Sequence, residues 1–329
     1  MYTDMPEASL HAYRSTQTEP DDFDVFWADT LADAQRHPLN VTATRVTDAP
    51  GAPALTTLDV YDITFAGFGG QPIRAWLRVP AGATIPLPAI VQFHGYGRGR
   101  GQAFENLLWA SAGYAHFDMD VRGQGSGGTT GDTPDDAGDT AGGGPQVPGF
   151  LTRGIASPSS YYYRRLYTDA VRAVAAARSL DLVDETRVGV MGTSQGGGIA
   201  LAVAGLVPNL AAVVARVPFL CDFPRASVIT NALPYREIAQ YLAAHRLSVA
   251  AVHETLSFFD GVNFAARATA PVAITVGLMD AVCPPSTVFG AFHAYAGPKT
   301  ITVWPYNGHE GGAWEDDALA LRVFAERLR

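Results

Sequence analysis

The sequence predicts an α/β fold with a doubly wound, mostly parallel sheet. Six short runs rich in β-branched residues are typical of strands buried on both faces: 89–95, 115–120, 187–192, 211–216, 272–277 and 300–304. Helical patterns separate most of them, at 160–180, 196–206, 284–296 and 316–328. Strands that alternate with helices favour a parallel sheet with right-handed crossovers.

Composition agrees with a large globular core. The 329 residues are 47% hydrophobic and 17% charged, which excludes a disordered chain or a coiled coil. The net charge is −9 and no Lys/Arg cluster occurs, so neither a nucleic acid nor a membrane is an expected partner. Val188–Ala215 is uncharged and long enough to span a bilayer, but its glycines and a Pro-Asn pair favour a strand, a turn, a helix and a strand. Cys221 and Cys283 are expected to be free thiols in a reducing compartment, and no signal peptide is expected.

The remaining elements follow in chain order. Residues 20–36 predict an N-terminal helix, and 59–65 and 72–79 predict two strands. Residues 123–150 are rich in Gly, Asp and Thr and predict a long loop. Residues 218–264 show helical patterns outside the βα rhythm, which indicates an insertion over the edge of the sheet.

These elements predict one domain over residues 1–329. It would carry a helical extension over about 1–40 and a cap-like insertion over about 218–264. The insertion is rich in apolar and aromatic side chains, some of which we expect in a pocket wall or a subunit contact.

The chemical prediction centres on Gly192-Thr193-Ser194-Gln195-Gly196. A buried strand runs into this motif and a small-residue helix follows it directly, which is the setting of a nucleophile elbow. The glycines allow a strained turn that exposes the serine hydroxyl above the sheet. The alternative is an ordinary glycine-rich turn between a strand and a helix.

A serine nucleophile needs a base that is held by an acid. In this architecture the acid and then the base follow the serine along the chain. Asp280 comes just after the strand at 272–277, and His309 follows the strand at 300–304. Both lie where open α/β sheets place catalytic groups, so we expect Ser194, Asp280 and His309 to form a triad.

An oxyanion requires preorganised N–H donors. The usual pair is the amide after the nucleophile, here Gln195, and one from the loop after the third predicted strand. That loop reads His94-Gly95-Tyr96-Gly97, and Tyr96 is the candidate donor. His94 is expected to anchor the loop rather than to act in catalysis.

Two other patterns carry less weight. The glycines of 123–128 match a dinucleotide fingerprint, but no helix follows to receive a pyrophosphate. Four nearby acids lack calcium-loop spacing and predict a solvated acidic loop: Asp132, Asp135, Asp136 and Asp139. We find no His/Cys spacing that suits zinc, and expect neither cofactor nor metal.

Taken together, these motifs resemble carbohydrate esterase family seven, the acetyl xylan esterases and cephalosporin C deacetylases. The hallmark trio is present as Arg122-Gly123-Gln124, Gly192-Thr193-Ser194-Gln195-Gly196 and His309-Glu310. Similarity extends to PDDFDVFWADTL near the start, PYREI at 234–238 and the segment around Asp280.

The resemblance implies an α/β-hydrolase fold with Ser194 as nucleophile, His309 as base and Asp280 as acid. It implies oxyanion donors at Gln195 and Tyr96, and a structural role for the Arg-Gly-Gln motif. Acetyl esters of xylo-oligosaccharides and cephalosporins are the implied substrates, hydrolysed by a cytoplasmic homo-oligomer, often a hexamer. The alternatives are an esterase for larger acyl or aryl groups and a non-catalytic binding protein of the same fold.

Overall fold

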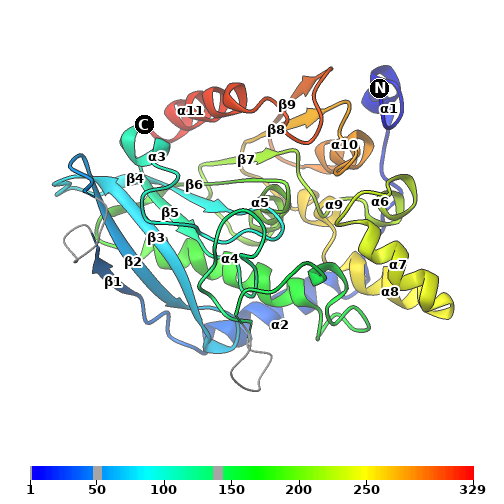
Figure 1. Cartoon of the computed structure of the whole chain (residues 1–329), viewed down its shortest axis with the longest axis horizontal. Coiled ribbons are helices and arrows are strands. Elements are labelled where there is room, and N and C mark those ends of the chain that lie inside the picture. Colours follow the sequence, from blue (N-terminus) through cyan, green and yellow to red (C-terminus); the bar gives the residue numbers. More distant parts are fainter. Residues whose placement is uncertain (1, 47–53, 136–143) are drawn as a thin grey trace.

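The computed structural model describes residues 2–46, 54–135 and 144–329. Its centre is a nine-stranded sheet in the order β1-β2-β3-β5-β4-β6-β7-β8-β9 (Figure 1). The strands are β1 (Thr42–Arg45), β2 (Leu58–Ala66), β3 (Pro72–Pro80), β4 (Leu87–Phe93), β5 (Ala115–Met119), β6 (Val183–Thr193), β7 (Ala212–Arg216), β8 (Val272–Gly277) and β9 (Lys299–Trp304).

The predicted doubly wound sheet is confirmed. Strands β4 to β9 pair in parallel, and all six β-branched runs of the sequence lie in them. Strands β1, β2 and β3 add an antiparallel edge. The sequence did not predict β1, because its four residues are all exposed and show no apolar alternation.

Helices cover both faces of the sheet. They are α1 (Glu7–Ala12), α2 (Phe23–Gln35), α3 (Leu108–Ser111), α4 (Tyr162–Arg178), α5 (Gln195–Leu206), α6 (Phe223–Ile229), α7 (Arg236–Ala244), α8 (Val249–Ser257), α9 (Gly261–Ala265), α10 (Pro285–Ala294) and α11 (Trp314–Leu328), with short 3₁₀ turns at Phe68–Gly70, Phe150–Thr152 and Arg246–Ser248. Figure 1 shows α3 and α11 on one side of the sheet and α2 and α4 on the other. Each face has its own apolar cluster, and Phe324 of α11 packs with Trp109 of α3 in the smaller one.

The uncharged stretch Val188–Ala215 forms most of β6, all of α5 and most of β7. The chain turns at Ser194 and around Pro208 and Asn209, and the strand, turn, helix and strand follow one another as the sequence indicates. Within the described residues, no helix combines the length and the apolar character needed to cross a membrane.

The 218–264 segment contains α6 to α9, in agreement with the helical prediction. Most of the large aromatic and apolar side chains of this segment lie in the core, which leaves few of them for the expected pocket wall or subunit contact. Six are at most 6% exposed: Phe219, Leu220, Phe223, Tyr235, Phe258 and Phe259. They pack into the main core cluster together with the N-terminal helix, which the sequence could not reveal.

For Asp135, the prediction of a solvated acidic loop is wrong. This carboxylate is buried and accepts hydrogen bonds from Arg122, Arg153 and Arg165. Asp132, in contrast, is half exposed and pairs with Arg100. Asp136 and Asp139 lie outside the described residues.

Candidate active site

Ser194 occupies a sharp turn between β6 and α5. Its φ of 59° and ψ of −120° lie outside the regions that L-residues favour, so the backbone is strained. A Cβ at Gly192 would lie 2.2 Å from the carbonyl carbon of Gly196. A Cβ at Gly196 would lie 2.1 Å from the Phe93 carbonyl oxygen. Both glycines are therefore required by close backbone approach, as the elbow motif predicts.

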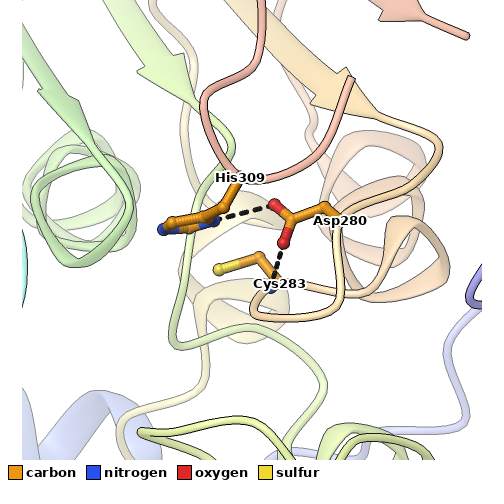
Figure 2. A group of neighbouring side chains, drawn as sticks. All are labelled: Asp280, Cys283 and His309. Carbon is orange, nitrogen blue, oxygen red and sulfur yellow. Dashed lines mark hydrogen bonds and ion pairs between the residues drawn. The ribbon is translucent and has the colours of Figure 1, made fainter. Parts of the chain in front are cut away.

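Three loops at the carboxyl ends of β6, β8 and β9 bring the predicted triad together. His309 Nε2 lies 3.0 Å from Ser194 Oγ, and His309 Nδ1 lies 2.8 Å from Asp280 Oδ2. Figure 2 shows the Asp280 carboxylate between the imidazole and the backbone of Cys283. Its Oδ1 accepts the amides of Val282 at 2.7 Å and Cys283 at 2.9 Å, which fixes its orientation.

Asp280, Cys283 and His309 also form a group whose ligand atoms lie within 4.8 Å of one another, close enough to hold a metal ion. The carboxylate is already shared between the imidazole and two amides. Burial raises the pKa of the Cys283 thiol well above its usual value, which disfavours the thiolate that a metal requires. The donor set therefore suits a proton-transfer chain better than a metal centre.

The two predicted oxyanion donors lie beside the serine. Gln195 begins α5, and Tyr96 belongs to the loop after β4. Neither amide donates to an acceptor among the residues that the structure describes. Gly97, with φ 78°, completes the turn that follows Tyr96. Two N–H groups are thus left for a ligand oxygen.

The Tyr96 side chain is held by Glu237 of α7, a residue that the motif analysis did not select. The tyrosine hydroxyl lies 2.8 and 2.9 Å from the two Glu237 carboxylate oxygens. It accepts amides from Gly149 and Phe150, at 3.1 and 2.8 Å. Burial raises the pKa values of both Tyr96 and Glu237. The PYREI similarity contained this glutamate but gave no reason for it.

The Arg-Gly-Gln motif ties the same loop to the elbow. Gln124 Oε1 accepts the Gly97 amide at 2.6 Å, and its Nε2 donates to the Gln195 side-chain oxygen at 3.0 Å. Arg122 is fully buried and makes a two-bond pair with Asp169 of α4, at 2.5 and 2.8 Å. Gly123 between them has φ 67°, which favours glycine. The motif positions the site and does not line its cavity.

His94, the expected anchor of this loop, contacts β5. Its Nε2 lies 2.6 Å from Asp118 of β5, a fully buried carboxylate that also pairs with Arg78. Burial opposes the charged imidazole, but Asp118 raises the pKa of His94 above its usual value. Gly95 carries the chain toward the serine: a Cβ there would lie 4.0 Å from Ser194 Cβ.

Glu310 shapes the turn that presents His309. Its carboxylate accepts the Gly308 amide at 3.1 Å and the Asn307 side chain at 3.0 Å. A hydrogen bond from its own backbone amide lowers the pKa of Glu310, and those from Asn307 and Gly308 lower it further. The His-Glu pair of the motif is therefore the imidazole that faces Ser194 and the residue that supports its loop.

A cavity of about 670 Å³ opens over Ser194 and His309. Trp109, Met191 and Arg216 form part of its wall, and Leu233 and Pro234 bring the 218–264 segment to it. This volume lies within the range of small-molecule sites.

The architecture and the elbow define a protein of the α/β-hydrolase fold. The family model "Acetyl xylan esterase (AXE1)" matches residues 1–323. The chain therefore belongs to the acetyl xylan esterase family, carbohydrate esterase family seven.

Individual relatives agree with this assignment. The chain is 38% identical to the acetyl xylan esterase from Paenibacillus sp. R4, with a TM-score of 0.87 over 98% of this chain and 99% of that one. It is 33% identical to acetyl xylan esterase 1 from Thermoanaerobacterium sp. JW/SL YS485, with a TM-score of 0.87 over 99% of this chain and 100% of that one. It is 30% identical over 298 residues, 88% of this chain, to the acetyl esterase Axe7A of Xylanibacter ruminicola. The match spans 63% of that curated relative's length.

Proposed function

We propose that this protein is a serine esterase that removes acetyl groups from small acetylated carbohydrates and from cephalosporin-type acetyl esters. The observation that carries the proposal is the hydrogen-bonded series Ser194, His309 and Asp280, which opens into the cavity beside two unpaired amides. Membership of the acetyl xylan esterase family indicates that the acyl group removed is acetyl.

The reaction begins at the serine hydroxyl. His309 Nε2 takes the proton from Ser194 Oγ as that oxygen attacks the ester carbonyl. Asp280 accepts the Nδ1–H bond, keeps the imidazole in this tautomer and stabilises the imidazolium. The Tyr96 and Gln195 amides donate to the tetrahedral oxyanion.

Collapse of this intermediate breaks the ester bond. The departing alcohol takes the proton from His309 and leaves the acetyl group on Ser194. His309 then takes a proton from water, whose oxygen attacks the acetyl carbonyl. Acetate leaves and Ser194 recovers its proton from His309.

We further propose a single-domain cytoplasmic enzyme that assembles as a homo-oligomer, with six subunits as the family resemblance implies. The N-terminal extension supports the domain assignment, because Leu10, Phe23 and Trp27 belong to the same core cluster as the sheet. Cys221 and Cys283 are free and buried, which is compatible with a reducing compartment.

A substrate panel tests the function. Acetyl esters of p-nitrophenol and xylo-oligosaccharides should be hydrolysed, and kcat/KM should fall by about tenfold or more from acetyl to butyryl, the scale of methylene discrimination in a tight pocket. A serine-directed phosphonate should label Ser194 and abolish activity. Faster hydrolysis of octanoyl or aryl acyl groups would favour the larger-acyl alternative, and an inert protein would favour the binding alternative.

A further inference from the structure

Arg216 has a hydrogen-bonding edge that the protein leaves empty. It is the last residue of β7, is 9% exposed and forms part of the active-site cavity wall. Its Nη1 donates to Asp317 Oδ1 at 2.6 Å. Its Nε and Nη2 are buried and lack a partner among the described residues. Because unsatisfied buried donors are costly, this edge indicates a missing acceptor.

The same edge binds carboxylates in two other arginines of this protein, and backbone carbonyls in Arg78 and Arg172. Arg122 uses Nε and Nη2 to hold both oxygens of Asp169, at 2.5 and 2.8 Å. Arg165 holds both oxygens of Asp135 in the same way, at 2.9 and 2.8 Å. The planar guanidinium matches a carboxylate in this two-bond geometry. A single ligand group that accepts from both donors of Arg216 is therefore a carboxylate, as in the pairs of Arg122 and Arg165.

The charges of the cavity also favour an anion, although the whole chain carries −9. Arg98 is exposed at the cavity and makes no ion pair within the described residues. Asp317 is the one acidic side chain among the described residues that line it, and it already pairs with Arg216. The described residues of the cavity wall thus carry two guanidinium groups and one carboxylate.

Arg216 is close to the reacting serine in the fold. It pairs with Thr193 across β6 and β7, and its carbonyl accepts the Ser194 amide at 2.9 Å. A substrate whose ester lies at Ser194 therefore extends within the same cavity toward Arg216. Since an acetyl group carries no charge, the anionic group must belong to the alcohol part of the ester.

We propose that Arg216 forms a carboxylate-binding subsite, so that acetyl esters with an anionic alcohol part are preferred. The proposal rests on the esterase function proposed above. Both atoms of the free edge are buried, so the guanidinium must rotate toward the cavity to bind a ligand. Asp317, whose side chain is 36% exposed, can follow that rotation.

The test compares 4-acetoxybenzoate with 4-acetoxybenzamide, which share size but differ in charge. We expect a higher kcat/KM for the benzoate. Arg216→Gln should lower kcat/KM for the benzoate by about tenfold or more by raising KM. This is the effect expected when a charge-assisted pair of two hydrogen bonds is lost. The benzamide value should change less than about threefold. Arg187→Gln, which removes an arginine outside the cavity, is the matched control and should change neither.

Inhibition of the unaltered enzyme gives a second measurement that does not depend on the folding of a variant. 4-Hydroxybenzoate should compete with 4-acetoxybenzamide, and 4-hydroxybenzamide should compete much more weakly. The subsite proposal would be overturned if the two phenols inhibit equally or if kcat/KM is no higher for the benzoate. It would also be overturned if Arg216→Gln lowers kcat/KM equally for both esters. If neither ester nor any other acetyl ester is hydrolysed, the proposed function itself is wrong.

Two natural sources could supply this carboxylate. An acetylated xylo-oligosaccharide with or without a uronic acid branch tests a saccharide source. An acetoxymethyl cephem with a free or an esterified carboxylate tests a cephalosporin source. A preference for the free acid in either pair, lost in Arg216→Gln, identifies the source, and no preference in both pairs would contradict the subsite.

Discussion

At the scale of single residues, the site depends on backbone geometry as much as on side chains. Ser194 keeps its positive φ because its carbonyl accepts the amides of Gly198 at 3.0 Å and Phe219 at 2.9 Å, while its own amide is bonded to β7. This network holds the hydroxyl toward His309. The serine is therefore positioned before substrate binds, which lowers the cost of reaching the transition state.

Ser194→Ala and His309→Ala should each lower kcat by roughly 10⁴-fold or more. The double variant should lose little further, because the triad acts as a unit. Steady-state kinetics on an acetyl ester measure this, with thermal unfolding as the control for folding. Near-normal turnover in either single variant would refute the assigned roles.

Glu237→Gln tests whether the Tyr96 hydroxyl positions the oxyanion donor. The change weakens a buried charge-assisted hydrogen bond, so we expect kcat to fall roughly tenfold with little change in KM, less than complete loss of a donor. Tyr96→Phe should have a similar effect, since the backbone amide remains. If both variants raise KM at unchanged kcat, the pair contributes to substrate binding instead.

His116 of β5 should make stability dependent on pH. Burial lowers its pKa to about 3, below the value of about 6.5 expected in the unfolded chain. Between these values the unfolded state binds more protons, so acidification destabilises the fold. From pH 7 to pH 5 the contribution should be about 2 kcal/mol.

Urea unfolding of the unaltered protein and of His116→Gln at both pH values measures this contribution. The variant should lose less stability on acidification. His245→Gln, at an exposed histidine, should behave like the unaltered protein. Equal losses in all three proteins would show that His116 does not titrate as proposed.

At the scale of elements, the loop after β5 joins three parts of the structure. Arg122 connects it to α4, Gln124 to the oxyanion loop and the elbow, and Asp135 to Arg153 and Arg165. The prediction of solvated acids fails for Asp135, because its arginine partners are distant in sequence. The motif residues of this loop therefore act through hydrogen bonds and ion pairs with other elements.

Asp135→Asn should destabilise the protein by about 3 kcal/mol, because it removes the one carboxylate that the mostly buried Arg165 pairs with among the described residues. Asp132→Asn is the matched control in the same loop: its side chain is 52% exposed, and its buried partner Arg100 keeps the carboxylate of Asp62, so the loss should cost about 1 kcal/mol. Urea denaturation compares the two. Similar effects would mean that the buried carboxylate contributes no more than the half-exposed one.

At the scale of the whole molecule, the proposed homo-oligomer would need a surface other than the buried aromatic side chains of the 218–264 segment. Several apolar side chains of that segment remain exposed, among them Val228, Leu233 and Leu247. We expect light scattering of the purified protein to give six times the chain mass, as the resemblance implies. A concentration-independent monomer would contradict the oligomer.

The parallel strands, the elbow and the chain order of Ser194, Asp280 and His309 could be predicted from the sequence. These features are encoded locally, by β-branched runs and by residues placed just after strand ends. The fold was needed to find the partners of Asp135, the hydrogen bonds of Glu237 with Tyr96 and the edge of Arg216 that has no partner among the described residues. Each depends on groups from separate loops and helices that meet in space. Sequence spacing carries no information on such contacts, because packing and burial determine which distant side chains meet and which donors remain unpaired.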